Sequence, residues 1–301
     1  MPCFNPLQGF QFIKKDGSKS RPFFGAQLPE LSALGKVVPV PIPCGRCIGC
    51  RLERSRQWAM RCVHEASLHK ENSFITLTYD DQHVPKDFSL KKRDFQLFMK
   101  RLRKELGEKK IRYFAAGEYG ENTFRPHYHA IIFGHQFKDR KNVTKETENG
   151  IKTISVSEKL NEIWGKGFAS SGNMTFESAA YVARYCLKKI NGPEAESHYF
   201  GREPEFSLMS RRPGIGANWL KKFKKDVYPN DICFARGKPC KPPKYYDEML
   251  KKVDEELFKL IKANRVPEYD PDEYMTGDNS PERLFERAKV VKLKQKKNPR
   301  L

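Results

Sequence analysis

Stretches with strand-like and helix-like spacing of apolar residues alternate through the middle of the chain. SFITLTY (73–79) is rich in β-branched and aromatic residues, which is typical of a strand. KIRYFAAGE (110–118) and HYHAIIF (127–133) have the same character and are separated by the turn-rich YGENTFRP. We expect these two to be neighbours in one sheet, and we predict a further strand at 168–176.

Helices are predicted where apolar residues recur every three or four positions opposite a charged side. This pattern covers 51–70, 158–164, 177–190 and roughly 246–263, and another helix is expected to begin near Ser89 as its N-cap. Strands and helices alternate irregularly. The sequence therefore favours an α+β fold over a doubly wound one.

The two ends of the chain lack these patterns. Residues 1–43 are predicted to be loop, because the prolines of VVPVPIP (37–43) exclude a helix and argue against a central strand. From residue 266 the chain is charged and interrupted by proline, so we expect a disordered basic tail. We divide the chain into an N-terminal loop region with a cysteine-rich element (1–50), a folded domain (51–265) and the tail (266–301).

Composition adds a strong charge imbalance. The 301 residues include 57 Lys and Arg against 37 Asp and Glu, a formal net charge of +20. A polyanion such as a nucleic acid backbone is the partner that this charge favours. The alternatives are a basic surface that is simply solvated, or one that lies on anionic lipid.

The sequence does not indicate a membrane protein. No apolar run approaches the length that crosses a bilayer, and the first residues lack the apolar segment of a signal peptide. We expect the protein to stay in the cytoplasm of the cell that makes it. Its eight cysteines should then be mostly reduced and available to metals or to the core.

Two histidines stand one residue apart at the start of the strand predicted at 127–133. His127 and His129 should point to one face, about 7 Å apart along the chain, where they can share a divalent cation. Glu118 ends the preceding strand and reaches the same face if the two strands pair antiparallel; Glu121, in the turn, is the competing carboxylate. The ion would be Mg²⁺ or Mn²⁺. The alternative is two surface histidines at a sheet edge.

The helix predicted at 177–190 carries two tyrosines and two cations on one side. At about 100° per residue, a single wedge of the helix holds Tyr181, Arg184, Tyr185 and Lys188. The opposite side holds Ala179, Val182, Ala183, Cys186, Leu187 and Ile190. A phenol beside cations can become a nucleophile for a phosphodiester. The alternative is that the tyrosines only border a buried face.

Three cysteines with C-x2-C-x2-C spacing lie on a loop flanked by proline and glycine, namely Cys44, Cys47 and Cys50. Thiolates this close in sequence favour a structural Zn²⁺, which needs a fourth ligand. Cys3 is the first choice, and Cys62 and His64 are the alternatives. Cys62 also fits the apolar face of its helix as a core residue.

A basic, glycine-containing segment, SRRPGIGANW (210–219), precedes a predicted helix. Its glycines are placed where a backbone could approach phosphate at a helix N-terminus. The charges that would contact nucleic acid there are Arg211, Arg212, Lys221 and Lys222. A basic loop followed by a glycine-started helix, with no ligand, explains the segment equally well.

Three of these stretches occur in a characteristic order. FITLTYDD, GEYGENTFRPHYHAIIFG and YVARYCLKK resemble, in sequence, the three motifs of the rolling-circle replication initiators called HUH endonucleases. The twin tyrosines and CGRCIGCR resemble the replication-associated proteins of small single-stranded DNA phages, the gokushovirus branch of the microviruses. The motifs span about residues 73–190, and PGIG and KPPKYYD extend the similarity over most of the chain.

The resemblance implies a fold and roles for residues. The fold is a central antiparallel sheet flanked by helices, an RRM-like core with the histidine pair on a central strand. By position, the metal ligands are His127, His129 and Glu118, and the nucleophiles are Tyr181 and Tyr185. Lys188 matches the lysine three positions after the second tyrosine. Arg184 departs from the family, which often has lysine there; the charge is retained, but the reach and geometry of the side chain differ.

The resemblance also implies an activity. Such an enzyme nicks one strand at the origin of a circular replicative form, keeps a 5′-phosphotyrosyl bond, frees a 3′ hydroxyl for synthesis and rejoins the strand after one round. It needs no ATP, and the sequence has no GxxxxGK[ST] loop. Its partners would be single-stranded origin DNA, supercoiled replicative-form DNA and the host's helicase and replication machinery, in the cytoplasm of a bacterial host. The alternatives are a zinc-containing nucleic-acid-binding protein without catalysis, and a plasmid initiator or transposase with the same chemistry.

Overall fold

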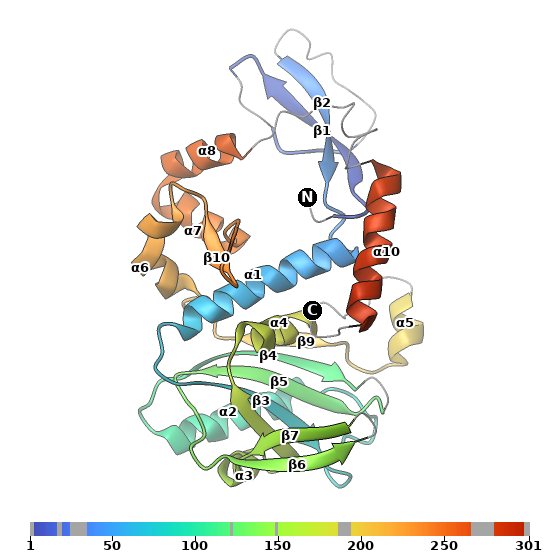
Figure 1. The fold of residues 1–301 in the computed structure, drawn as a ribbon, viewed down its shortest axis with the longest axis vertical. Coiled ribbons are helices and arrows are strands. Elements are labelled where there is room, and N and C mark those ends of the chain that lie inside the picture. Colours follow the sequence, from blue (N-terminus) through green and yellow to red (C-terminus); the bar gives the residue numbers. More distant parts are fainter. Residues whose placement is uncertain are drawn as a thin grey trace. The chain divides into compact units, whose positions relative to one another are not determined.

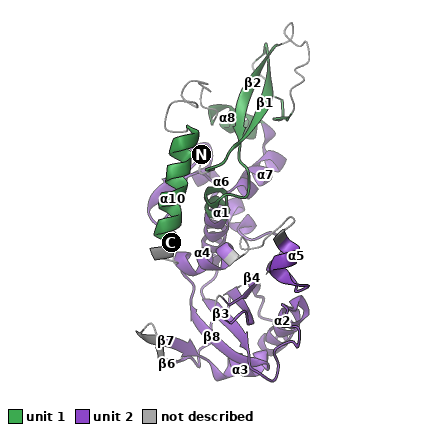
Figure 2. Ribbon diagram, turned by 90° about the vertical axis from the view of Figure 1, so that its right-hand side faces the viewer, with its two compact units in different colours: residues 1–54, 256–301 green, residues 55–255 purple. Residues whose placement is uncertain are grey.

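The computed structural model of the chain describes residues 3–16, 20–24, 35–120, 123–147, 150–185, 194–265 and 280–297 (Figure 1). The chain divides into two compact units, which are coloured separately in Figure 2. The smaller unit joins the two ends of the chain, residues 1–54 and 256–301, and the larger unit is residues 55–255.

The larger unit is built on an antiparallel sheet of seven strands (Figure 1). Their order across the sheet is β6-β7-β8-β3-β5-β4-β9. The strands are β3 (Asn72–Tyr79), β4 (Arg112–Tyr119), β5 (Pro126–Phe133), β6 (Lys141–Thr147), β7 (Gly150–Val156), β8 (Gly167–Asn173) and β9 (Phe206–Met209). The predicted antiparallel pairing of β4 with β5 is confirmed, and β5 lies in the interior of the sheet.

Helices pack on both faces of this sheet, because β4 and β5 carry apolar side chains on both faces. On one face α2 (Lys92–Leu106) and α3 (Glu158–Trp164) contribute Phe98 and Trp164 to a core with Tyr128. On the other face α1 (Ile48–Ala66) and α4 (Phe176–Tyr185) pack small residues against Ile131 and Phe133. The fold is therefore α+β with a large antiparallel sheet flanked by helices.

The start of α2 differs from the prediction. The helix begins at Lys92, and its N-cap, Lys91, makes no side-chain capping bond. The predicted cap, Ser89, accepts a hydrogen bond from the backbone N–H of Glu203, 2.8 Å from its hydroxyl oxygen. The hydroxyl thus holds a neighbouring segment. By contrast, Ser157 does cap α3, accepting from the N–H of Leu160.

The C-terminal part of the larger unit contains a hairpin and short helices. These elements are α5 (Glu194–Tyr199), α6 (Ala217–Val227), β10 (Cys233–Ala235), β11 (Lys238–Cys240) and α7 (Lys244–Val253). The next helix, α8 (Glu255–Asn264), begins at the last residue of the larger unit. His64 of α1 contacts both α6 and α7. Its ring stacks on Trp219 of α6 with ring centroids 3.5 Å apart, and its Nδ1 forms a 2.8 Å hydrogen bond with the hydroxyl of Tyr246 on α7. Burial lowers the pKa of His64 to about 4.

The smaller unit corrects two predictions. Residues 7–14 and 35–42 form an antiparallel hairpin, β1 (Leu7–Lys14) and β2 (Gly35–Ile42), where loop was expected. Among the described residues β2 pairs only with β1, so its prolines lie on an edge strand, where they are tolerated. The expected disorder of the tail is wrong for α10 (Pro281–Lys297), which begins with proline and buries Leu284. The remaining tail residues, 266–279 and 298–301, lie outside the described part.

None of the helices in the described residues is long and apolar enough to span a membrane.

Candidate active site

A carboxylate and two imidazoles converge on one face of the sheet. Glu118 of β4 lies directly opposite His127 of β5 in the antiparallel register, and His129 follows two positions later on the same face. Glu118 Oε1 lies 2.8 Å from His127 Nε2 and 2.7 Å from His129 Nε2. The predicted trio is therefore assembled by the pairing of two adjacent strands. The competing carboxylate, Glu121, lies outside the described residues.

The other ring nitrogen of each histidine also has a polar partner. His127 Nδ1 lies 3.1 Å from the carbonyl oxygen of Arg125, and His129 Nδ1 lies 2.9 Å from Thr76 Oγ1. A carbonyl oxygen only accepts hydrogen bonds, so His127 must carry a proton on Nδ1. The Nε2 atoms of both rings face Glu118 Oε1, so these two nitrogens and the carboxylate could share one cation.

The dimensions of the trio fit a small divalent ion. Six ligands at 2.0–2.1 Å in octahedral geometry are separated from their neighbours by about 3 Å, close to the 2.7 and 2.8 Å found here. Glu118 and His129 are almost fully buried. Burial raises the pKa of the Glu118 carboxyl, but the two imidazoles outweigh it and bring the pKa below its usual value, so the carboxylate stays charged. These three residues can hold Mg²⁺ or Mn²⁺.

Helix α4 places a tyrosine beside the trio. Reciprocal hydrogen bonds between Thr175 and Ser178 fix the start of the helix. Its fully buried residues, Ala179, Val182 and Ala183, pack on the sheet as predicted. The ring of Tyr181 consequently stands edge-on to the ring of His129, with centroids 5.1 Å apart.

The other residues predicted on this helix are only partly within the described structure. Arg184 lies on α4 and is partly buried. Tyr185 is the last residue of α4, but its side chain is outside the described part, as is Lys188. Within the described side chains, a phenol therefore lies beside the trio at Tyr181.

Thr76 is a site residue that sequence reasoning missed. It lies opposite His129 in the pairing of β3 with β5, where its hydroxyl can accept the Nδ1–H of that ring. The available signal was the alternation of Thr76 and Thr78 with apolar residues in SFITLTY. Hydroxyls on a strand with a buried opposite face indicate a polar partner across the sheet.

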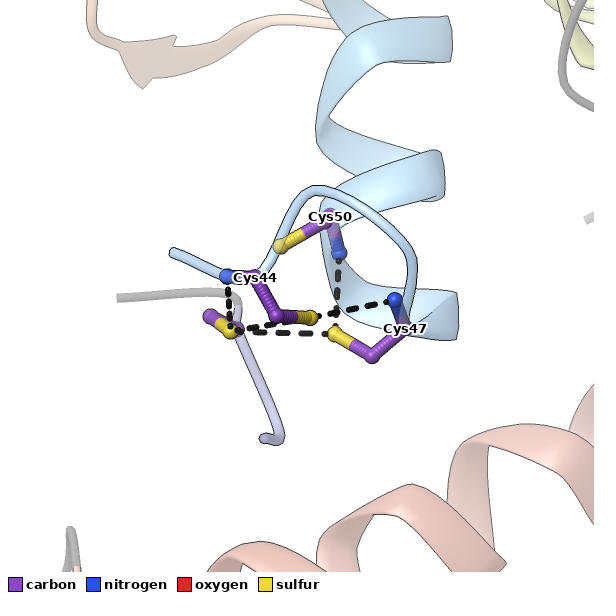
Figure 3. Close-up of side chains that lie close together, drawn as sticks. Cys44, Cys47 and Cys50 are labelled. Atoms are coloured by element: carbon purple, nitrogen blue, oxygen red, sulfur yellow. Dashed lines mark hydrogen bonds between the residues drawn. The ribbon is translucent and has the colours of Figure 1, made fainter. Parts of the chain in front are cut away.

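The four cysteines of the smaller unit also come together. Cys3 Sγ lies 3.7 Å from Cys44 Sγ and 3.8 Å from Cys47 Sγ, and the ligand atoms of all four lie within 4.8 Å of one another (Figure 3, where Cys44, Cys47 and Cys50 are labelled). The prediction of Cys3 as the fourth member is confirmed as to position. The alternatives are elsewhere: Cys62 is fully buried in the core of the larger unit, and His64 stacks on Trp219.

The cysteine cluster has the dimensions of a zinc site. Four sulfurs about 2.3 Å from a zinc ion form a tetrahedron with edges of about 3.8 Å. Backbone N–H groups point at the sulfurs, including those of Cys44 towards Cys3 at 3.3 Å and of Phe4 towards Cys47 at 3.2 Å. Burial raises the pKa of the Cys47 thiol, but the N–H groups of Cys50 and Phe4 and neighbouring thiols lower it to about 6. A thiolate is the form that binds zinc.

The glycine segment before α6 does not offer a phosphate site at its backbone. The N–H of Gly216 donates to Glu65 Oε2 at 2.7 Å, so a buried carboxylate already occupies this helix N-terminus. A Cβ on Gly214 or Gly216 would lie 2.4 or 2.6 Å from a tyrosine hydroxyl, so these glycines serve close packing. The cations predicted to contact nucleic acid are all exposed, namely Arg211, Arg212, Lys221 and Lys222.

Comparison with known proteins finds relatives of the part of the chain that contains these residues. The family described as replication-associated protein ORF2/G2P matches residues 72–190, which contain the trio and α4. Replication-associated protein VP4 of Bdellovibrio phage phiMH2K is 34% identical over 218 residues, covering 70% of this chain and 67% of that protein.

Two further relatives are also phage or viral proteins. Replication-associated protein ORF2 of Spiroplasma virus 4 is 31% identical over 280 residues, covering 88% of this chain and 86% of the relative. Replication-associated protein ORF4 of Chlamydia phage 1 is 30% identical over 219 residues, covering 71% and 54%. No solved structure matches the chain. The chain therefore belongs to the family of phage replication-associated proteins, the initiators of rolling-circle replication.

Proposed function

We propose that this protein initiates viral DNA replication as a nicking and joining endonuclease of the HUH type, with Tyr181 as a nucleophile. The observation that carries the proposal is the position of the Tyr181 ring, 5.1 Å from the ring of His129 in a trio that fits a divalent ion. A non-catalytic DNA-binding protein would not require a phenol beside such a trio.

In the proposed reaction, the phenol oxygen of Tyr181 attacks the phosphorus of the scissile phosphodiester. The bond to phosphorus forms as the bond between phosphorus and the 3′ oxygen breaks, and the phenol proton is exchanged through solvent for the one that the released 3′ hydroxyl gains. A 5′-phosphotyrosyl bond results, which conserves the phosphodiester for later rejoining. A bound Mg²⁺ or Mn²⁺ supplies the positive charge that polarises the phosphate.

The chain's own residues prepare this step. Glu118, His127 and His129 would hold the ion, while Thr76 and the Arg125 carbonyl orient the two rings. Within the proposal, Tyr185 attacks the regenerated origin after one round. Arg184 and Lys188 neutralise phosphate charge.

We further propose that Cys3, Cys44, Cys47 and Cys50 hold a structural Zn²⁺. The support is the match between the sulfur separations of 3.7 and 3.8 Å and the edge of a ZnS₄ tetrahedron. Such an ion would connect the N-terminal residues to the loop before α1. Its binding free energy would then contribute to the stability of the smaller unit.

The proposed partners follow from the chemistry and the charge. Single-stranded origin DNA and supercoiled replicative-form DNA are the substrates, and exposed cations such as Arg211, Arg212, Lys221 and Lys222 contact phosphates. Unwinding is left to the host's helicase and replication machinery, in the cytoplasm of a bacterial host. The formal charge of +20 supports binding to DNA.

The proposal is tested by covalent adduct formation. The purified protein is incubated with labelled single-stranded origin DNA and Mn²⁺, and the adduct is separated under denaturing conditions. We expect the adduct to be lost with the double change Tyr181→Phe and Tyr185→Phe, and with His127→Ala and His129→Ala. Tyr113→Phe, on the opposite face of the sheet, and His198→Ala, on α5, are the matched controls. An undiminished adduct in the double tyrosine variant would refute the nucleophile assignment.

A further inference from the structure

The face of the sheet that carries the trio continues across two more strands. In register, Glu118 of β4 lies opposite His127 of β5, which lies opposite Thr78 of β3, which lies opposite Phe168 of β8. Directly opposed residues of antiparallel strands lie on the same face. Phe168 therefore shares the face of the metal ligands, two strands from His127.

The side chain of Phe168 is much more exposed than those of Ala169 and Ser171 on the same strand. Its side chain is 71% exposed, whereas Ala169 and Ser171, which point to the opposite face, are 4% and 2% exposed. The trio's face is covered elsewhere by α4 and α1, which pack on Ala116, Ile131 and Phe133. An added Cβ on Gly172, further along β8 with the same side-chain direction as Phe168, would meet nothing within 4 Å. As far as the described residues show, this face of β8 is thus open at Phe168 and Gly172.

An exposed phenyl ring beside a phosphodiester-cleaving site fits one ligand class well. Proteins that bind single strands combine positive charge with aromatic rings on which bases stack, because every base has a flat face. Two strand spacings of about 4.8 Å place Phe168 roughly 10 Å from His127 along the sheet. At about 3.4 Å per stacked nucleotide, that distance corresponds to about three nucleotides.

Resting on the proposed nicking function, we propose that Phe168 stacks on a base of the unpaired DNA strand, within about three nucleotides of the scissile phosphate. The stacked base holds the strand on the open face of β8 and so aligns the phosphate with the trio and Tyr181. Phe168 is a positioning residue in this account, and it contacts DNA without taking part in bond making. The continuity of the face and the charge of +20 favour DNA over another protein as the occupant.

Binding is measured without cleavage, so that the two proposals can fail separately. Fluorescently labelled single-stranded origin DNA is titrated, at fixed salt and with EDTA, with proteins that also carry Tyr181→Phe and Tyr185→Phe. We expect Phe168→Ala to raise the Kd roughly 5- to 150-fold, the range for loss of one stacked base. Phe168→Trp should restore binding. Phe200→Ala, which removes a ring that is 81% exposed on another segment, should have little effect.

A positional test identifies the stacked base. Single abasic nucleotides are introduced one at a time over the five positions on each side of the scissile phosphate. One of them should weaken binding to the parent protein as much as Phe168→Ala does, and should cost the Phe168→Ala protein nothing further. The dependence of log Kd on log salt should be unchanged in Phe168→Ala, because no phosphate contact is lost.

The outcomes separate the hypotheses. Equal Kd values for Phe168→Ala and the parent, with both proteins shown to be folded by their melting temperature, overturn the stacking proposal even if the adduct forms. If Phe168→Ala raises the Kd for DNA but the protein with both tyrosines intact never forms an adduct, the stacking proposal stands and the nickase proposal is overturned. Loss of self-association in Phe168→Ala, with DNA binding unchanged, would assign the face to a second copy of the chain and also overturn the stacking.

Discussion

Thr76 offers a test of the proposed metal site that changes neither a proposed ligand nor the proposed nucleophile. Its hydroxyl lies 2.9 Å from His129 Nδ1, on the side of the ring away from Glu118. Thr76→Val keeps the shape of the side chain and replaces the hydroxyl with a methyl group. If Nε2 of His129 binds an ion, Nδ1–H is then left without its acceptor in a residue that is only 4% exposed.

The size of the effect follows from that loss. An unsatisfied buried donor costs about 1–3 kcal/mol, and loss of the partner that orients a metal-bound histidine typically costs 10- to 100-fold in metal affinity. We therefore expect the Mn²⁺ concentration at half-maximal adduct formation to rise roughly 10- to 100-fold in Thr76→Val. The rate at saturating Mn²⁺ should change much less, because Tyr181 and the three ligands are retained.

Thr78 provides the matched control. It is the next residue on the same face of β3, it lies opposite His127, and it too is partly buried. Thr78→Val therefore makes the same chemical change two residues away, without removing the acceptor of His129 Nδ1. If Thr76→Val and Thr78→Val shift the Mn²⁺ dependence equally, or neither shifts it, the orienting role of Thr76 is wrong.

Three further predictions concern stability and the second metal. Cys3→Ser and Cys47→Ser should each remove the zinc that elemental analysis of the purified protein would find at one ion per chain, whereas Cys62→Ser, in the other unit, should retain it. Burial lowers the pKa of His64 from 6.5 to about 4, so between these pH values the unfolded chain binds a proton at His64 that the folded chain does not. The contribution of His64 to the free energy of unfolding is thus full above pH 6.5 and falls as the pH is lowered towards 4. Urea unfolding should show a loss of about 2 kcal/mol from this residue between pH 7 and pH 5, and His64→Gln should lack that loss. Gly216→Ala should lower the free energy of unfolding by about 2–4 kcal/mol, because its φ of +79° and the nearby Tyr246 hydroxyl both oppose a Cβ. Gly237→Ala has a similar φ of +72° but no atom near the added Cβ, so it should cost only about 1–2 kcal/mol. Equal losses in the two glycine variants would contradict the packing argument.

The trio could be predicted because it depends on two short-range regularities. The alternation of side chains along a strand puts His127 and His129 on one face, and a hairpin-like pairing of consecutive strands brings Glu118 opposite His127. The helical wedge likewise predicted that Tyr181 and the buried face of α4 point in different directions. Each inference needed only local geometry.

What could not be predicted depends on partners far away in the sequence. Glu65 occupies the N-terminus of α6 from 151 positions away, so the glycines there could be interpreted equally well as a phosphate loop. The prolines of β2 suggested loop because nothing in the sequence shows that β2 is an edge strand, paired in the described residues only with β1. The exposure of Phe168 depends on where α1 and α4 end over the sheet, which no periodicity reveals.

Mass spectrometry of the trapped adduct is the most direct test of the claim that Tyr181 attacks a DNA phosphate beside Glu118, His127 and His129. The protein is reacted with a short single-stranded origin oligonucleotide and Mn²⁺, digested with protease and nuclease, and the modified peptide is sequenced. We predict a nucleotide phosphate on Tyr181 or on both Tyr181 and Tyr185, present with Mn²⁺ and absent with EDTA or with Glu118→Ala. An adduct on a residue outside α4, or one that forms equally well in EDTA, would contradict the claim.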